Sequence, residues 1–218
     1  MQTSTAGFYG KVPCKGDFVG RGFSQQMTVQ LDQWLQRGMV YSKQALAEQW
    51  SDRYMVAPIW RFYLAANTLD EQCWIGVMIP SVDRVGRCFP LLLAVPVTQA
   101  IANLQAFDQL TQTFIKLEDM LLESLEYNFD FDGFCHNVAQ LTVIENHRTT
   151  AMFSFTPQQI QTANNQSSEQ QDTSSLCIWQ SEGSDDIPSQ LFLSAQLPEQ
   201  QQFLSYFTGV NTTEDANA

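Results

Sequence analysis

The chain has 218 residues, 44% of them hydrophobic and 12% aromatic, which is enough to bury one substantial core, so we expect a single domain. Its formal net charge is −12, and residues 98–218 hold two basic residues against sixteen acidic ones. This distribution lacks the clustered lysines and arginines that binding to nucleic acid or to an anionic membrane surface requires.

The apolar segments are too short to cross a membrane. The longest runs, such as CFPLLLAVPV at residues 88–97, are about half of the roughly 20 residues that a membrane-spanning helix needs. The first ten residues have neither the basic nor the apolar region of a signal peptide. We therefore predict a cytoplasmic protein that does not insert into membranes.

The first hundred residues alternate between strand-like and helix-like patterns. GFYGKV at residues 7–12 predicts a strand, and the glycine-rich residues 13–23 predict a loop. Apolar residues recur at helical spacing from Met27 to Trp50, with Ser24 as the N-cap and Gly38 as a point where this helix kinks or divides.

Three strand-like runs follow this helix. Residues 57–66 and 73–80 are separated by a turn-like segment and predict an antiparallel hairpin. Residues 88–97 are continuously apolar, which predicts a strand buried on both faces. Pro90 and Pro96 are expected to confine its regular pairing to the residues between them.

The second half opens with the clearest helical pattern of the chain. Leucine and phenylalanine recur at a 3–4 spacing from Leu104 to Leu125, with acidic residues on the complementary face, which predicts a helix that faces the core. The later predicted elements are a helix at 134–141, strands at 150–155, 175–180 and 190–196, and a helix at 198–207 with Pro198 in its first turn.

Two segments of the second half carry no apolar period. Residues 157–175 are rich in Gln, Asn and Ser and predict a mobile loop, and the residues from about 210 predict a disordered tail. Strands in hairpins with helices inserted between them are typical of the α+β class. We therefore expect a mostly antiparallel central sheet covered by helices.

The sequence contains no motif of an established enzyme class. GKVPCKGD at residues 10–17 lacks the first glycine and the Ser or Thr of a P-loop, and no GxGxxG or GxSxG motif is present. Cys135, His136 and His147 could contribute to a metal site or a thiol–imidazole pair, but neighbouring side chains diverge and no further ligands follow at useful spacing. DFDGF at residues 130–134 is explained better as a helix end. We predict no catalytic residue, no metal and no cofactor.

Charged and small polar residues inside apolar or glycine-rich segments remain as the candidate site. They are Lys11, Asp17, Arg21, Arg61, Ser81, Asp83, Arg84 and Arg87. Arg61 stands between two aromatic residues of a strand, so its side chain is expected on the opposite face. A buried guanidinium requires a carboxylate, and Asp17 or Asp83 is expected to supply it.

Two roles are open for these residues. They could form buried ion pairs that hold two loops against the sheet. Alternatively, Arg21, Arg84 or Arg87 could bind an acidic or phosphorylated partner from an exposed surface. In PSVDRVGRCFPL, residues 80–91, we expect the arginines to hold the connection by carboxylate pairing and to leave one guanidinium for a partner.

Six segments together resemble one protein family. They are GFYGKVPCKGDFVGRGF, LDQWLQRG, WSDRYMVAPIWRFYL, GVMIPSVDRVGRCFPL, SLCIWQSEG and AQLP. In this order they resemble the TagF/ImpM family of type VI secretion-associated proteins. One departure is SLCIWQ, where the family pattern has adjacent tryptophans and this chain has only Trp179.

The resemblance implies a cytoplasmic protein that represses type VI secretion after translation and has no catalytic activity. It implies that repression works by binding and sequestering the forkhead-associated scaffold protein of the secretion system. The binding patch is expected near residues 17–21 and 81–87. Two alternatives stay open: a small hydrolase or phosphatase-like enzyme that uses Asp83 or Cys88, and a structural accessory subunit of the secretion apparatus.

Overall fold

The computed structural model describes residues 5–101, 103–142 and 176–209. These residues contain seven strands: β1 (Gly7–Gly10), β2 (Val19–Arg21), β3 (Trp60–Leu64), β4 (Cys73–Ile79), β5 (Leu91–Val97), β6 (Cys177–Ser181) and β7 (Gln190–Ser194). They form one sheet in the order β2-β1-β5-β4-β3-β6-β7, and all neighbouring strands are antiparallel. The predicted strand at 150–155, the predicted loop at 157–175 and the predicted tail lie outside the described residues.

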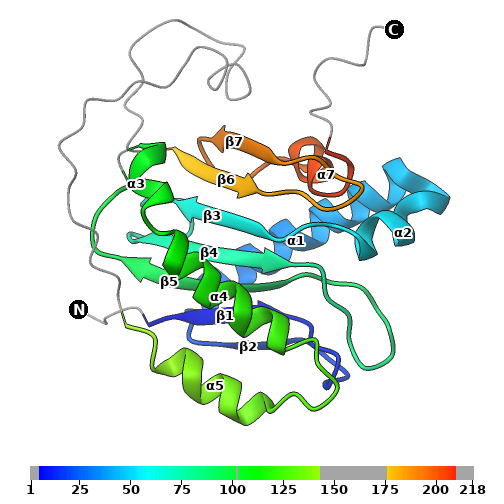
Figure 1. Ribbon diagram of the computed structural model, residues 1–218, viewed down its shortest axis with the longest axis horizontal. Helices are drawn as coiled ribbons and strands as arrows, with labels where there is room; N and C mark the ends of the chain where they lie inside the picture. The colour runs from blue at the N-terminus through cyan, green and yellow to red at the C-terminus, as the bar shows by residue number, and fades with distance from the viewer. Residues whose placement is uncertain (1–4, 102, 143–175, 210–218) are drawn as a thin grey trace, which may run out of the picture.

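Helices cover both faces of the sheet. They are α1 (Gln25–Leu46), α2 (Trp50–Met55), α3 (Leu104–Asp108), α4 (Thr111–Glu123), α5 (Phe131–Ala139) and α7 (Gln200–Thr208). In Figure 1, α4 crosses in front of the sheet, α5 lies beside its β1–β2 end, and α1 lies behind it; α2 and α7 pack against α1. The expected α+β class with a central antiparallel sheet is confirmed.

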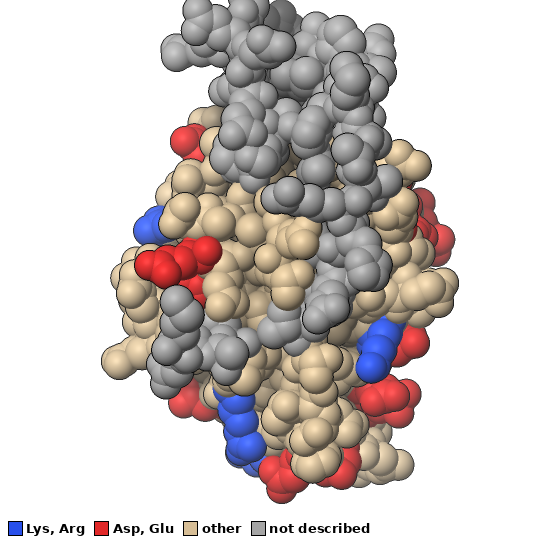
Figure 2. Space-filling model, turned by 90° about the vertical axis from the view of Figure 1, so that its left-hand side faces the viewer, with Lys and Arg blue, Asp and Glu red and all other residues tan. Residues whose placement is uncertain are grey.

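The two ends of the sheet carry different connections. The connections from β1 to β2 and from β4 to β5 lie together at one end, on the right of Figure 1. Figure 2 shows the opposite end, where the visible described atoms form a mainly uncharged centre with separate charged side chains around it.

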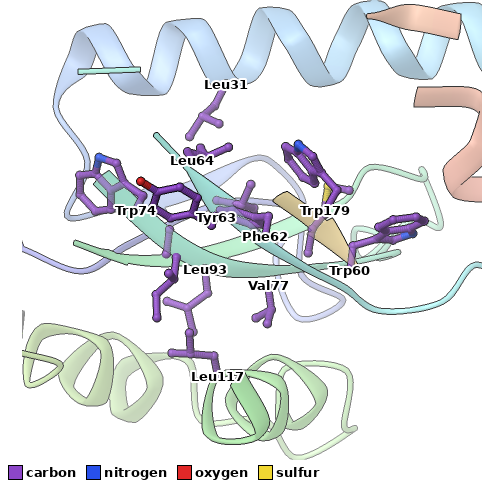
Figure 3. Close-up of a cluster of buried hydrophobic side chains, with 14 of the residues drawn as sticks. Leu31, Trp60, Phe62, Tyr63, Leu64, Trp74, Val77, Leu93, Leu117 and Trp179 are labelled. Carbon is purple, nitrogen blue, oxygen red and sulfur yellow. The ribbon is translucent and has the colours of Figure 1, made fainter. Parts of the chain in front are cut away.

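The core is built by strict alternation along the central strands. Trp60 and Phe62 of β3 face the α1 side, where the Phe62 ring lies 5.1 Å from that of Trp179. Trp179 in turn lies 5.5 Å from the Trp34 ring of α1. On the other face Leu117 of α4 packs under the sheet (Figure 3). Every residue of β5 is buried, as expected for a strand covered on both faces.

The first helix does not break at Gly38. Helix α1 runs through this residue without a break. A Cβ atom at this position would lie only 2.4 Å from the ring of Phe203 in α7, so only glycine leaves room for that ring. The glycine therefore serves close helix packing. The chain breaks instead at Ala47, whose φ of 47° is left-handed, and a short 3₁₀ turn at residues 47–49 leads into α2.

Other element boundaries also differ from expectation. The predicted helix from 104 to 125 is divided into α3 and α4, since Leu110 bonds back to the carbonyl of Phe107 in a tighter turn. Helix α5 begins earlier than predicted, at a cap in which the Asp130 carboxylate accepts the Gly133 N–H (3.0 Å). This confirms DFDGF as a helix end. Pro198 precedes α7, whose N-cap is Glu199.

The predicted loop at 13–23 includes the short strand β2. Within the part of the chain that the structure describes, no helix has the length and apolar character to span a lipid bilayer.

Candidate functional site

The candidate site is organised around the carboxylate of Asp83, where the chain passes from β4 to β5. This side chain is fully buried, and each of its oxygens accepts two hydrogen bonds. Oδ1 accepts the backbone N–H groups of Val85 (3.1 Å) and Arg87 (2.9 Å). Oδ2 accepts the Lys11 ammonium (3.0 Å) and Arg87 Nε (2.6 Å). One carboxylate therefore joins its own turn to the residue that follows β1.

Residues 80–91 form a short hairpin that this carboxylate holds from inside. A β-bridge between Val82 and Cys88 forms its stem. The Gly86 N–H donates to the Asp83 carbonyl (2.9 Å), and the φ of Gly86 is 82°, a left-handed conformation that favours glycine. The sequence places the acid and the glycine at the positions that such a turn requires.

Ser81 ties the base of the hairpin to two other elements. Its hydroxyl donates to the carbonyl of Lys11 (2.8 Å). The hydroxyl of Tyr54, in α2, accepts the Ser81 N–H (2.9 Å) and donates to the Ser81 carbonyl (2.8 Å). Burial raises the pKa of Tyr54 above its ordinary value, so this hydroxyl keeps the proton that it donates.

The environment of Asp83 favours the charged carboxylate. Burial alone raises the pKa of Asp83, but hydrogen bonds from the Arg87 backbone N–H, from Lys11 and from the Arg87 side chain outweigh it and hold that pKa well below its ordinary value. A general base or nucleophile needs a lone pair free to face a substrate. The four hydrogen bonds of Asp83 occupy those positions, so its geometry is that of a structural anchor.

Cys88, the other residue of the enzymatic alternative, is half-buried in the stem of the hairpin. Burial raises the pKa of its thiol, which disfavours the thiolate that a cysteine nucleophile requires.

Three further cations lie outside this framework. The Arg84 N–H donates to the carbonyl of Lys15 (2.8 Å), which holds the hairpin beside the loop after β1. The Lys15 ammonium lies 4.5 Å, and the Arg21 guanidinium carbon 5.9 Å, from the centre of the Phe131 ring. All three side chains are exposed, and none forms an ion pair with a carboxylate within residues 5–101, 103–142 and 176–209.

Two apolar side chains are exposed beside these cations. Phe18 is 40% exposed and packs on Phe89 of the hairpin, with 4.8 Å between the ring centres. Val85, at the tip of the hairpin, is 70% exposed. Asp17 is exposed, and its carboxylate accepts the N–H of Phe18 (2.8 Å). We call Lys15, Phe18, Arg21, Arg84 and Val85 together the basic loop surface.

Arg61 does not belong to this site. Its Nε and Nη2 donate to the two carboxylate oxygens of Glu118 in α4 (2.6 and 3.1 Å), and its Nη1 donates to Glu182 (2.8 Å). Hydrogen bonds to Glu118 raise the pKa of Arg61 further. The expectation that Asp17 or Asp83 pairs with Arg61 is therefore wrong. The reason is that Arg61 faces α4 from within β3, whereas Asp17 and Asp83 lie at the end of the sheet.

The other candidate residues separate into a framework and an exterior. Lys11, Ser81, Asp83 and Arg87 form the framework, and Arg87 Nη2 also donates to the carbonyl of Gly16 (2.7 Å). Asp17, Arg21 and Arg84 remain outside. Sequence reasoning missed Lys15, Phe18, Val85 and Tyr54 as members of the site. Large apolar residues in glycine-containing turns were the available signal for Phe18 and Val85, since a turn gives them no core to enter.

The metal and thiol candidates do not come together. Cys135 is buried and His136 is exposed on successive positions of α5, and His147 lies outside the described residues. Among the described residues, no three His, Cys, Asp or Glu side chains are grouped so that they could hold a metal ion.

Comparisons with known proteins agree on one relationship. A family model described as the TagF N-terminal domain, type VI secretion system-associated, matches residues 7–141, which include the framework and the basic loop surface. The crystal structure of PA0076 from Pseudomonas aeruginosa PAO1 is similar, with a TM-score of 0.73 and 30% sequence identity over 94% of this chain and 95% of that chain. No curated protein matches the sequence.

Proposed function

Since the chain belongs to the TagF family of type VI secretion system-associated proteins, we propose that it is a cytoplasmic regulator that represses type VI secretion after translation. It acts by binding the forkhead-associated scaffold protein of the system and withdrawing that protein from the secretion machinery. The observation that carries the proposal is the family match over residues 7–141.

The geometry at the end of the sheet supports a binding role without catalysis. The Asp83 framework holds two loops in one arrangement through buried hydrogen bonds. Outside it, exposed cations without carboxylate partners among the described residues lie beside exposed apolar side chains. A preorganised surface of this kind binds a partner with a small loss of conformational entropy.

Two measurements test the proposal directly. The purified chain should bind the purified scaffold protein in solution, and its overproduction in the bacterium should lower the amount of secreted effector in the medium while intracellular effector levels stay the same. Deletion of its gene should raise secretion. A chain that binds no scaffold protein and leaves secretion unchanged would contradict the proposal.

The same preparation separates the two alternatives. Co-purification with the assembled sheath or membrane complex, and not with free scaffold protein, would favour a structural subunit. Turnover of a phosphatase or esterase substrate that either Asp83→Asn or Cys88→Ala reduces, in a variant that remains folded by circular dichroism, would favour an enzyme. We expect neither result.

A further inference from the structure

The loops that form the site differ in charge from the rest of the molecule. Residues 11–21 and 81–87 contain five basic residues against two acidic ones, a net charge of +3, in a chain whose net charge is −12. Five of the eleven lysines and arginines of the chain thus lie in β2, just after β1, or in the connections from β1 to β2 and from β4 to β5. The opposite end of the sheet shows only separate charged side chains around a mainly uncharged centre (Figure 2).

The framework uses part of this positive charge and leaves part of it exposed. Lys11 and Arg87 both form ion pairs with the carboxylate of Asp83, whose single negative charge offsets one of their two positive charges. Lys15, Arg21 and Arg84 form no ion pair with a carboxylate in the described parts of the chain, although the protein has 23 acidic residues. Intramolecular pairing therefore does not account for these three cations.

The three cations are held in place by contacts other than ion pairs. Lys15 and Arg21 both lie against the ring of Phe131, in α5. The guanidinium of Arg84 lies over the backbone of Gly16, where Nη2 would be 3.3 Å from an added Cβ atom. The contacts with Phe131 restrict Lys15 and Arg21 before a partner binds, and such restriction lowers the entropic cost of binding.

The shape of the surface indicates an extended partner. Three hollows, of about 340, 300 and 270 Å³, are lined by other segments: α1 with the start of α7, the connection from α4 to α5, and α4 with residues 140–142. Lys15 lies in the connection from β1 to β2, Arg21 ends β2, and Arg84 lies in the adjacent hairpin. The exposed Phe18 and Val85 lie in the same two connections. A chain segment that carries several carboxylates and an apolar residue matches this distribution better than one phosphate group does.

We infer that the basic loop surface binds an acidic segment of the partner protein, with Asp or Glu carboxylates against Lys15, Arg21 and Arg84 and an apolar side chain against Val85 and Phe18. The identification of that partner as the scaffold protein rests on the proposed function. The negative charge of the rest of the chain repels an acidic segment elsewhere, so electrostatics direct it to this end of the sheet.

Titration of the full-length chain with purified scaffold protein tests the inference. The Kd should rise about tenfold between 50 and 300 mM NaCl, because exposed charge pairs are screened by salt. At 50 mM NaCl, Arg84→Glu and Val85→Asp should each raise the Kd by about tenfold. Arg37→Glu, the same charge reversal at an exposed position of α1, is the matched control and should leave the Kd within about twofold.

A poly-glutamate peptide with interspersed leucine is the second probe, and it tests the surface without the scaffold protein. It should bind the wild-type chain at 50 mM NaCl and compete with the scaffold protein, and Arg84→Glu should abolish both effects. Phosphatase treatment of the scaffold protein should leave its affinity unchanged.

The outcomes separate this inference from the proposed function. If the Kd for the scaffold protein changes neither with salt nor with Arg84→Glu and Val85→Asp, the inference is overturned and the proposed function stays in place. Binding of the acidic peptide without binding of the scaffold protein would contradict the proposed function and leave the acidic-segment surface in place. Loss of scaffold binding after phosphatase treatment would replace a carboxylate-bearing segment with a phosphorylated one, and the inference would then be wrong.

Discussion

Replacing Tyr54 with phenylalanine removes one oxygen atom from the junction between α2 and the hairpin at 80–91. Tyr54 is fully buried, and its hydroxyl both accepts the Ser81 N–H and donates to the Ser81 carbonyl. The carbonyl keeps a hydrogen bond from the N–H of Phe89 (3.0 Å). The Ser81 N–H has no other acceptor among the described residues and would remain buried and unpaired.

The expected loss of stability follows from these two hydrogen bonds. An unpaired buried donor costs about 1–3 kcal/mol, and the second lost hydrogen bond adds about 1 kcal/mol, so the free energy of unfolding should fall by about 2–4 kcal/mol. In a chain of this size 1 kcal/mol corresponds to about 2–4 °C in Tm, which gives a decrease of about 4–16 °C. Phenylalanine retains the ring that stacks on Trp50 (5.2 Å between centres), so lost aromatic packing contributes little.

Thermal unfolding followed by circular dichroism measures this effect, and the chain offers a matched control. The hydroxyl of Tyr206 is buried, yet it forms no hydrogen bond with the described residues. Tyr206→Phe should therefore leave Tm within about 2 °C of wild type or raise it. If both variants lose the same amount of stability, the assignment of the loss to the unpaired Ser81 N–H is refuted.

Three further predictions concern the framework, the exposed arginine beside it and the core. The pKa of Asp83 in the folded protein is held below its ordinary value of 3.8. The stability that the charged carboxylate contributes is therefore fully present above about pH 5, and it is lost as the pH falls below 3.8 and through the lower pKa of the folded state. Asp83→Asn should therefore lower Tm at pH 7, with a difference from wild type that shrinks below about pH 4; a difference independent of pH would contradict this. Gly38→Ala gains about 1 kcal/mol of helix propensity but forces a methyl group against Phe203, which costs about 1–3 kcal/mol, so Tm should not rise. Arg87→Glu should lower Tm, whereas Arg84→Glu should not; equal melting of the two variants would argue against the division into framework and exterior.

The features that were predictable from the sequence are mostly local. Asp83 and Arg87 are four residues apart in one turn, so their pairing could be anticipated from residues 80–91 alone. The continuously apolar run at 88–97 correctly predicted a strand buried on both faces, and strict alternation correctly placed Arg61 opposite its aromatic neighbours. The family resemblance is confirmed by the match over residues 7–141, which includes the four motifs at residues 7–91, while SLCIWQSEG and AQLP lie beyond the matched residues.

The features that were missed depend on how distant segments meet. Glu118 and Glu182 are 57 and 121 residues from Arg61, and only the crossing of α4 over the sheet and the return of β6 bring them together. The role of Gly38 depends on α7, which is formed by residues 200–208 and packs against α1. Spacing within one segment contains no information about such contacts.

The sheet does not end where the family match ends. Strands β6 and β7 extend the sheet beyond β3, and α7 covers Trp34 on the α1 side. A truncated chain that stops at residue 141 would leave one flank of β3 with unpaired backbone groups next to uncovered tryptophan and phenylalanine rings, which is the arrangement that templates intermolecular β-pairing. Strands β6 and β7 thus cover the flank of β3 that would otherwise pair with another molecule, and we expect a fragment that lacks them to aggregate.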